Sequence, residues 1–226
     1  MKLFIDAGTN LGQGLKQFND KFNFFSPREG EESWEVCTFE PNPNIKVKDL
    51  IKNVFPSATN ITAFPKALWT RNGTLKFTAQ GKATDAQRDA LEVITIPEKE
   101  LQGGGSHLAV IDKQFTPDNV HKKHNVVPCI DFASFLKKKS KHFSSIIVKL
   151  DVEGAEFRLI DHLIETNTLC LISQLYCETH EHFFYPSYTS ESGLSPEDAP
   201  KAAQRKKKFL EKIKKACPKL AFHNWH

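Results

Sequence analysis

The sequence predicts an α/β fold with a mostly parallel central sheet and helices on both faces. Short apolar strands alternate with stretches of helical periodicity along most of the 226-residue chain, and this alternation is typical of parallel sheets with helical crossovers. Three expected strands end directly at an acidic residue, namely Asp6, Asp151 and Glu178. Because ligands of such sheets bind outside the carboxyl ends of the strands, we expect a functional site at that edge.

The composition indicates one soluble globular domain spanning residues 1–226, with 39% hydrophobic and 26% charged residues. No apolar run approaches the roughly 20 residues that a membrane-spanning helix needs, and the N-terminus lacks the pattern of a secretory signal. The five cysteines form no CxxC pair, so we expect neither a zinc site nor a disulfide framework, and a reducing, cytoplasmic location. The net charge of +4 is too small to indicate a nucleic-acid partner.

The N-terminal half is expected to hold three strands, two helices and a hairpin. These elements follow from apolar runs, apolar spacings of three and four, and proline or glycine stops. We expect strands at 2–6, 34–39 and 61–69, and helices at 11–25 and 42–55. Asn72-Gly73 is a hairpin signal before a strand at 74–78, whereas Pro65 argues against a regular central strand over 61–69.

The second half of the sequence begins with a polar stretch over 79–125, which three consecutive glycines interrupt. We expect this stretch to be a lid or an insertion, with an edge strand at 92–96. We then expect strands at 126–130, 146–150, 169–177 and 219–225, and helices at 132–141 and 153–165. A basic amphipathic helix is expected at 201–216. Its default interpretation is a solvated face, and the alternative is a weak contact with a membrane surface.

The turn DAGTNLG at 6–12 joins the first strand to the first helix. Glycines let the backbone turn tightly and approach a ligand, and the turn lacks the GK[ST] of a phosphate-binding loop. An acid before the turn suits a cationic or zwitterionic ligand, such as the methionine part of S-adenosylmethionine. The alternative is a plain strand–turn–helix connection capped by Thr9 or Asn10.

The second strand ends in FEPNP at 39–43. A carboxylate at this place, here Glu40, is the usual partner of ribose hydroxyls because it accepts two hydrogen bonds from a cis-diol. The alternative is a solvated glutamate in a turn.

Two further motifs carry acids at the ends of later strands. In KLDVEGAE at 149–156, strand alternation puts Lys149 and Asp151 on the same side, whereas the acids at 153 and 156 can serve the helix dipole alone. In CETHEH at 177–182, Glu178 and His180 can form a general base or a metal cluster. The alternative is that His180 and His182 are surface loop histidines.

Taken in order, the motifs IDAGTNLGQ, FEPNP, ALWTRNGTLKF, IIVKLDVEGAEFRLI and YCETH resemble the FkbM-type S-adenosylmethionine-dependent methyltransferases over residues 2–180. DVEGAE, preceded by an Ile/Val-Lys strand, is the most specific of them. The resemblance implies a class I methyltransferase (Rossmann-like) fold with an antiparallel last strand, and O-methylation of a hydroxyl of a sugar or glycan. The alternatives are a hydroxyl of a small secondary metabolite or lipid, and a catalytically silent cofactor-binding scaffold.

The resemblance also assigns residues to the two halves of a site. The residues expected at S-adenosylmethionine are Asp6, Gly8, Thr9, Asn10, Gly12, Phe39, Glu40, Pro41, Ala67 and Asp151. The residues expected at the acceptor are Lys149, Asp151, Glu178 and His180, with Asp151 and Glu178 as candidate ligands of a divalent metal ion. Because sugar hydroxyls are very weak acids, the reaction needs a base or a metal ion, and the motifs leave both open.

Overall fold

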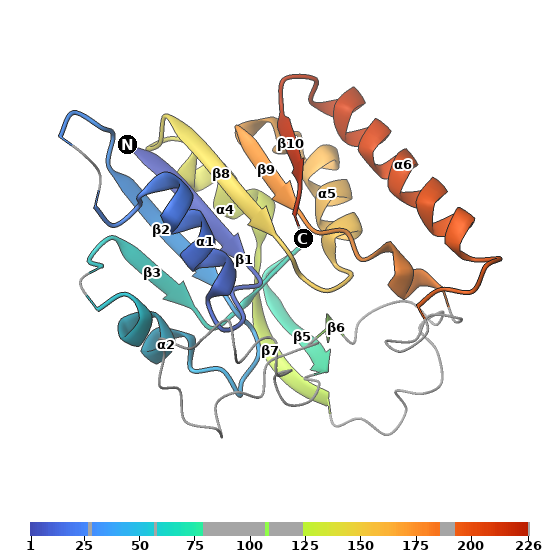
Figure 1. Ribbon diagram of the computed structural model, residues 1–226, viewed down its shortest axis with the longest axis horizontal. Helices are drawn as coiled ribbons and strands as arrows, with labels where there is room; N and C mark the ends of the chain where they lie inside the picture. The colour runs from blue at the N-terminus through green and yellow to red at the C-terminus, as the bar shows by residue number, and fades with distance from the viewer. Residues whose placement is uncertain (27–28, 57, 79–106, 109–123, 186–192, 226) are drawn as a thin grey trace.

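The computed structural model describes residues 1–26, 29–56, 58–78, 107–108, 124–185 and 193–225 (Figure 1). Its centre is a six-stranded sheet in the order β10-β9-β8-β1-β2-β3, in which every neighbouring pair is parallel. The strands are β1 (Lys2–Ala7), β2 (Trp34–Phe39), β3 (Ile61–Phe64), β8 (Ser145–Leu150), β9 (Gln174–Cys177) and β10 (Ala221–Asn224). The predicted α/β architecture is confirmed.

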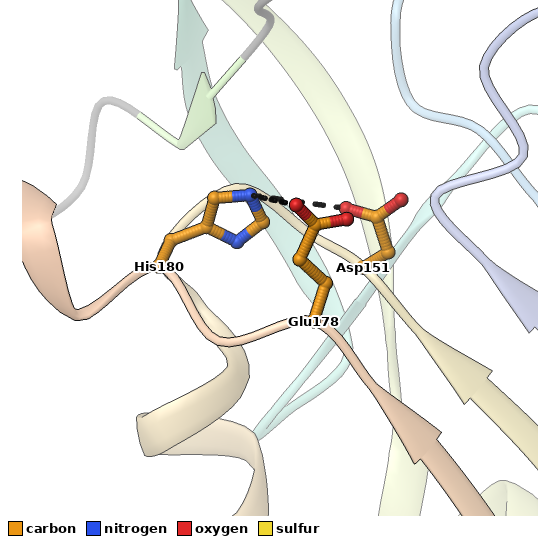
Figure 2. Close-up of side chains that lie close together, drawn as sticks. All are labelled: Asp151, Glu178 and His180. Carbon is orange, nitrogen blue, oxygen red and sulfur yellow. Dashed lines mark ion pairs between the residues drawn. The ribbon is translucent and has the colours of Figure 1, made fainter. Parts of the chain in front are cut away.

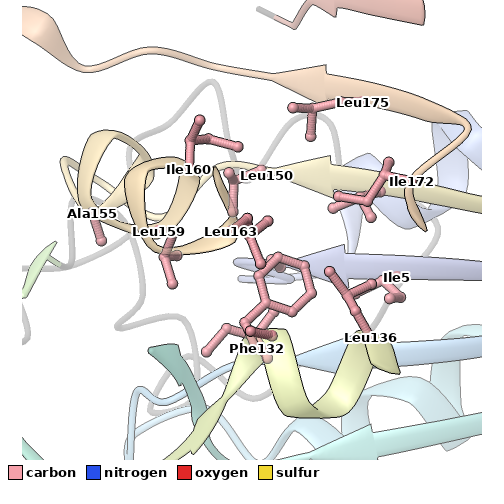
Figure 3. Close-up of a cluster of buried hydrophobic side chains, with 14 of the residues drawn as sticks. Ile5, Phe132, Leu136, Leu150, Ala155, Leu159, Ile160, Leu163, Ile172 and Leu175 are labelled. Carbon is pink, nitrogen blue, oxygen red and sulfur yellow. The ribbon is translucent and has the colours of Figure 1, made fainter. Parts of the chain in front are cut away.

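Helices cover both faces of this sheet, as alternation along the strands requires. In β1, Phe4 packs in a cluster with α1 (Gln13–Phe22) and α2 (Val47–Val54). Its neighbour Ile5 packs in the opposite cluster with α4 (Phe132–Lys139), α5 (Glu156–Glu165) and α6 (Ala199–Ala216) (Figure 3). Two short 3-10 helices, η3 (Leu169–Leu171) and η4 (Glu181–Phe184), flank β9. The elements that carry the strand tips are therefore fixed from both sides.

A second sheet has the order β4-β7-β5-β6, formed by β4 (Ala67–Trp69), β7 (His124–Asp131), β5 (Gly73–Thr78) and β6 (His107–Leu108). The single strand expected over 61–69 is wrong, because the chain leaves the central sheet at Pro65 and continues as β4 in the second sheet. The turn at Asn72-Gly73 forms, but β7 lies between β4 and β5. The expected hairpin pairing is therefore wrong as well.

Three further expectations need correction. The last strand, β10, is parallel to β9 and not antiparallel, since the long helix α6 returns the chain to the other end of the sheet before β10 begins. The strand expected over 169–177 is η3 followed by the shorter β9. Cys170 and Cys217 form a disulfide across 47 residues, so the cysteines do not support the inference of a reducing compartment.

The expected lid at 79–125 and its edge strand at 92–96 lie outside the described residues, apart from β6 and the start of β7. Within the described part of the chain, no helix combines the length and the apolar character needed to cross a membrane.

Candidate functional site

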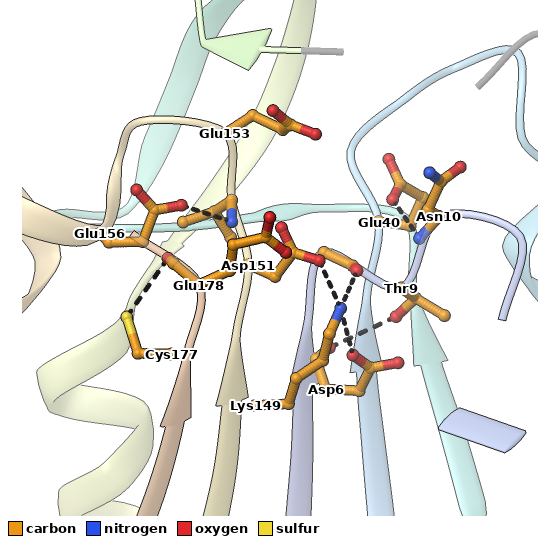
Figure 4. Close-up of polar contacts among 12 residues, drawn as sticks. Asp6, Thr9, Asn10, Glu40, Lys149, Asp151, Glu153, Glu156, Cys177 and Glu178 are labelled. Atoms are coloured by element: carbon orange, nitrogen blue, oxygen red, sulfur yellow. Dashed lines mark hydrogen bonds and ion pairs between the residues drawn. The ribbon is translucent and has the colours of Figure 1, made fainter. Parts of the chain in front are cut away.

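The glycine-rich turn after β1 lies at the carboxyl edge of the central sheet, beside the tips of β2 and β8 (Figure 4). Gly8 has a φ of +82°, and a Cβ atom built on it would lie 1.7 Å from the backbone oxygen of Asp151. The backbone N–H groups of Gly8 and Thr9 both donate to the carbonyl of Phe39, at 3.0 and 3.2 Å. Gly12 also has a positive φ, +86°, with no described heavy atom within 4 Å of an added Cβ. Glycine is thus required at position 8 by a close backbone approach.

Glu40 fixes this turn to the end of β2. Its Oε2 accepts a hydrogen bond of 2.7 Å from the backbone N–H of Asn10, and its Oε1 accepts one of 2.8 Å from that of Asn42. Burial raises the pKa of Glu40 to about 7, against the lowering effect of these two hydrogen bonds. Each carboxylate oxygen still has a lone pair that can accept a further hydrogen bond.

Lys149 lies in the middle of the site and is buried. Its Nζ donates to the carbonyl of Gly8 at 2.8 Å and forms ion pairs with Asp151 at 3.0 Å and Asp6 at 3.5 Å. Burial alone would lower the pKa of Lys149, but the carboxylates of Asp151 and Asp6 raise it above its ordinary value. Lys149 therefore holds β8, β1 and the glycine turn together as a permanent cation.

Asp6 and Asn10 leave polar atoms without a hydrogen-bond donor among the described residues. Both carboxylate oxygens of Asp6, which is fully buried, and Oδ1 of Asn10 are in this state. Burial raises the pKa of Asp6, although the nearby Lys149 opposes this effect. Buried polar atoms usually have hydrogen-bond partners, and the described residues supply only the ion pair of 3.5 Å between Lys149 and Oδ1 of Asp6.

A second group of side chains gathers around His180, at the adjacent tips of β8 and β9 (Figure 2). The Nε2 atom of His180 lies 3.4 Å from Glu153 Oε2, 3.8 Å from Glu178 Oε1 and 4.0 Å from Asp151 Oδ1. Asp151, Glu178 and His180 each offer one atom that could bind a metal ion, and these three atoms lie within 4.8 Å of one another. The clustering expected from the sequence for these three residues is confirmed.

Glu156 orients the imidazole of His180. The Glu156 side chain is fully buried, accepts hydrogen bonds from the backbone N–H groups of Val152 and Gly154, and lies 2.9 Å from Nδ1 of His180. Although burial alone would lower it, the hydrogen bond and the charge of Glu156 raise the pKa of His180 to about 9. The imidazole therefore carries a proton at pH 7, with Nε2 directed at the other carboxylates.

Comparison with known protein families shows to which family the chain belongs. A family model described as the Methyltransferase FkbM domain matches residues 6–191. The chain belongs to the FkbM methyltransferase family.

The resemblance read from the sequence motifs is thereby confirmed. Among solved structures, the chain is similar to the Methyltransferase FkbM from Methylobacillus flagellatus KT, with 9% sequence identity and a TM-score of 0.45. That match covers 96% of this chain and 39% of the other protein, so the chain spans about two fifths of that protein's length. A comparison with curated proteins finds no match.

The FkbM match contains both groups of side chains described above. Phe39, Pro41 and Ala67, which were also expected at the cofactor, offer it no polar side chain. Phe39 is buried and stacks on Phe64, with ring centroids 4.7 Å apart, so its carbonyl and not its ring faces the turn. Pro41 is half-buried and follows Glu40 directly, and Ala67 is buried at the start of β4.

The sequence interpretation missed the contact of Glu156 with His180 in this FkbM domain. The position of Glu156 in the first helical turn suggested a dipole effect, whereas the structure shows a buried contact with His180, 24 residues away. The signal that points to such a role is the sequence EGAE, in which the second acid precedes the apolar face of α5 and so faces the interior.

Proposed function

We propose that this FkbM methyltransferase is an S-adenosylmethionine-dependent O-methyltransferase whose acceptor is a hydroxyl of a sugar or glycan. The observation that carries the proposal is the pairing of two half-sites at one sheet edge. One is the glycine turn joined to Glu40, and the other is the Asp151, Glu178 and His180 cluster. Lys149 contacts both halves, through Gly8 and Asp151.

The residues of the glycine turn fit S-adenosylmethionine. The lone pairs of Glu40 that remain are suited to ribose hydroxyls. The oxygens of Asp6 and Asn10 that accept no hydrogen bond from the described residues suit the ammonium group of the methionine part, and Oδ1 of Asp6 is also paired with Lys149. The space next to Gly12 allows a ligand to approach the backbone closely. When bound, S-adenosylmethionine supplies a sulfonium methyl group that an oxygen nucleophile can displace in line.

The cluster around His180 supports activation of the acceptor hydroxyl. In the transfer, the new O–CH3 bond forms as the S–CH3 bond breaks, and the hydroxyl proton leaves the acceptor. Because His180 is protonated at pH 7, the carboxylates of Asp151 and Glu178 are the groups able to take that proton directly. In this scheme the His180 cation holds them in place and Lys149 orients Asp151 from the other side.

The same cluster also supports binding of a divalent cation. Oxygen ligands at about 2.1–2.4 Å from one ion lie about 3–5 Å from one another. The separations of His180 Nε2 from Glu178 and Asp151, 3.8 and 4.0 Å, fall within that range. Coordination through Nε2 would require loss of the proton that His180 carries in the metal-free cluster. A bound cation would lower the pKa of a coordinated hydroxyl. Chelation distinguishes this form of activation from direct transfer to a carboxylate.

Mass spectrometry of a panel of sugars, lipids and small metabolites after incubation with methyl-labelled S-adenosylmethionine tests the proposal. We expect a labelled methyl ether on a sugar or glycan. Glu178→Gln should retain binding of S-adenosylhomocysteine and lose at least tenfold in turnover. The matched control is Glu165→Gln, at the far end of α5. Transfer to a nitrogen, or full turnover in Glu178→Gln, would contradict the proposal. Loss of activity with EDTA and its recovery with Mg²⁺ or Mn²⁺ would assign activation to a metal ion, and unchanged activity would assign it to the carboxylates.

A further inference from the structure

A basic groove runs between α5 and α6. It has a volume of about 420 Å³. Its lining residues from α6 include the cations Lys201, Arg205, Lys208 and Lys212. These positions are spaced by four, three and four residues, so they share one face of the helix. The groove thus concentrates four positive charges on one wall.

The groove continues into a second cleft of about 550 Å³ that leads back toward the catalytic segment. The two depressions share the lining residues Phe157, Asp161 and Arg205. The second cleft extends to Gly154 and Ala155, which follow the acidic cluster and precede α5. Gly154 donates to the carboxylate of Glu156 that orients His180. A ligand in the groove is therefore on the same side of the molecule as the loop that builds the acceptor half-site.

The charges that line the groove are not all neutralised. Lys201 pairs with Asp198 at 2.8 Å, and Lys212 pairs with Asp161 at 2.5 Å. Arg205 and Lys208 have no ion pair within the described ranges. The groove consequently keeps two positive charges that no described carboxylate balances.

Among the described residues, aromatic rings and not an acid hold Arg205 in position. Its guanidinium lies 4.2 Å from the ring centre of Phe184 and 5.9 Å from that of Tyr185. Stacking on aromatic faces leaves the planar N–H donors at the edge of the guanidinium open for bidentate binding to an oxyanion. The apolar ring faces beside it, including Phe157 in the groove wall, suit the C–H face of a sugar ring.

We infer that this groove binds a phosphate group carried by the acceptor, so that the substrate is a phosphorylated sugar or glycan. A phosphomonoester carries a charge close to −2 near pH 7 and three acceptor oxygens, which matches the two unbalanced cations Arg205 and Lys208. A sulfate ester carries only one charge and matches less well. The description of the ligand as the acceptor rests on the proposed O-methyltransferase activity, whereas the binding of phosphate does not.

Calorimetry with glucose 6-phosphate as the probe tests the inference, with glucose and glucose 6-sulfate as comparisons. We expect glucose 6-phosphate to bind most tightly, and Arg205→Gln/Lys208→Gln to weaken it at least tenfold. The matched control is Lys207→Gln/Lys214→Gln, which removes two charges from the opposite face of α6 and should bind the probe like the wild type. Lys208 has no contact with a described aromatic ring, so Lys208→Gln alone should leave the fold intact and weaken binding about threefold or more. This single variant tests the inference if the double variant does not fold.

Equal weakening in the test and control pairs, or no preference for the phosphate over glucose, would overturn the inference. A different result would instead assign α6 to a membrane surface. In that case the protein binds phosphatidylserine vesicles but not the sugar phosphate, and the test and control double variants weaken vesicle binding equally. Titration of S-adenosylhomocysteine into the same samples separates the two proposals. If the probe binds as expected and S-adenosylhomocysteine does not bind at all, the proposed function fails while the phosphate site stands.

Discussion

Protonation of Glu40 should control the affinity for the cofactor near neutral pH. Burial raises the pKa of this carboxyl to about 7 from an ordinary value of 4.5. About nine tenths of the protein would therefore carry an ionised Glu40 at pH 8, and only about one tenth at pH 6. Ribose hydroxyls need the ionised form, because both of its oxygens accept hydrogen bonds. We expect the affinity for S-adenosylhomocysteine to fall about tenfold from pH 8 to pH 6, or about 1.4 kcal/mol.

Isothermal titration calorimetry at constant ionic strength, with wild type and Glu40→Gln, measures this effect. The variant should bind more weakly at pH 8, by about 1.5–3 kcal/mol for lost hydrogen bonds to a charged group, and its affinity should not change between pH 6 and 8. A wild-type affinity independent of pH would refute the reasoning. The same slope in Glu40→Gln would show that another group is responsible.

The sign of the matching effect on stability is opposite to that on affinity. Without ligand, the folded state binds more protons than the unfolded state between pH 4.5 and about 7, because the folded pKa of Glu40 is the higher one. The free energy of unfolding should therefore decrease as pH rises through this window, by about 3 kcal/mol in total. Urea unfolding of wild type and Glu40→Gln at pH 5 and pH 7.5 isolates this contribution as the difference between the two proteins.

Two further predictions concern the packing of the site. Gly8→Ala should lower the free energy of unfolding by about 2–4 kcal/mol, since its Cβ would overlap the backbone oxygen of Asp151 at a positive φ. Gly30→Ala, with a φ of +85° and no described atom nearby, should lose only about 1 kcal/mol in urea unfolding, and equal losses would contradict the role of the contact. Glu156→Gln should lower the pKa of His180 from about 9 toward 6.5, as followed by NMR of the imidazole, and an unchanged pKa would show that other acids set it.

The local pattern of the sequence predicts the central sheet and both halves of the site. The tips of β1, β8 and β9 each carry an acid directly after an apolar run. Because the carboxyl ends of parallel strands lie at one edge of a sheet, the convergence of Asp6, Asp151 and Glu178 can be predicted without knowing which strands are neighbours. Glu40 is predictable for the same reason, from its place at the end of β2.

Relations between distant segments could not be predicted in this way. The strand β7 separates β4 from β5 although about 50 residues intervene, and no local signal specifies that insertion. The disulfide between Cys170 and Cys217 depends on β9 and β10 pairing in parallel. The contact of Glu156 with His180 likewise joins two elements whose separation depends on the packing of α5. Each of these features is set by tertiary packing and not by periodicity.

The position of Lys149 between the two half-sites has a consequence for the effects of substitutions. Its ammonium group touches the glycine turn through Gly8 and the acceptor cluster through Asp151, so a substitution at Asp151 alters both at once. Glu178 and His180 make no hydrogen bond or ion pair with Lys149 in the described structure. Substitutions at Glu178 or His180 should therefore impair acceptor activation while cofactor binding stays intact, whereas substitutions at Lys149 or Asp151 should impair both.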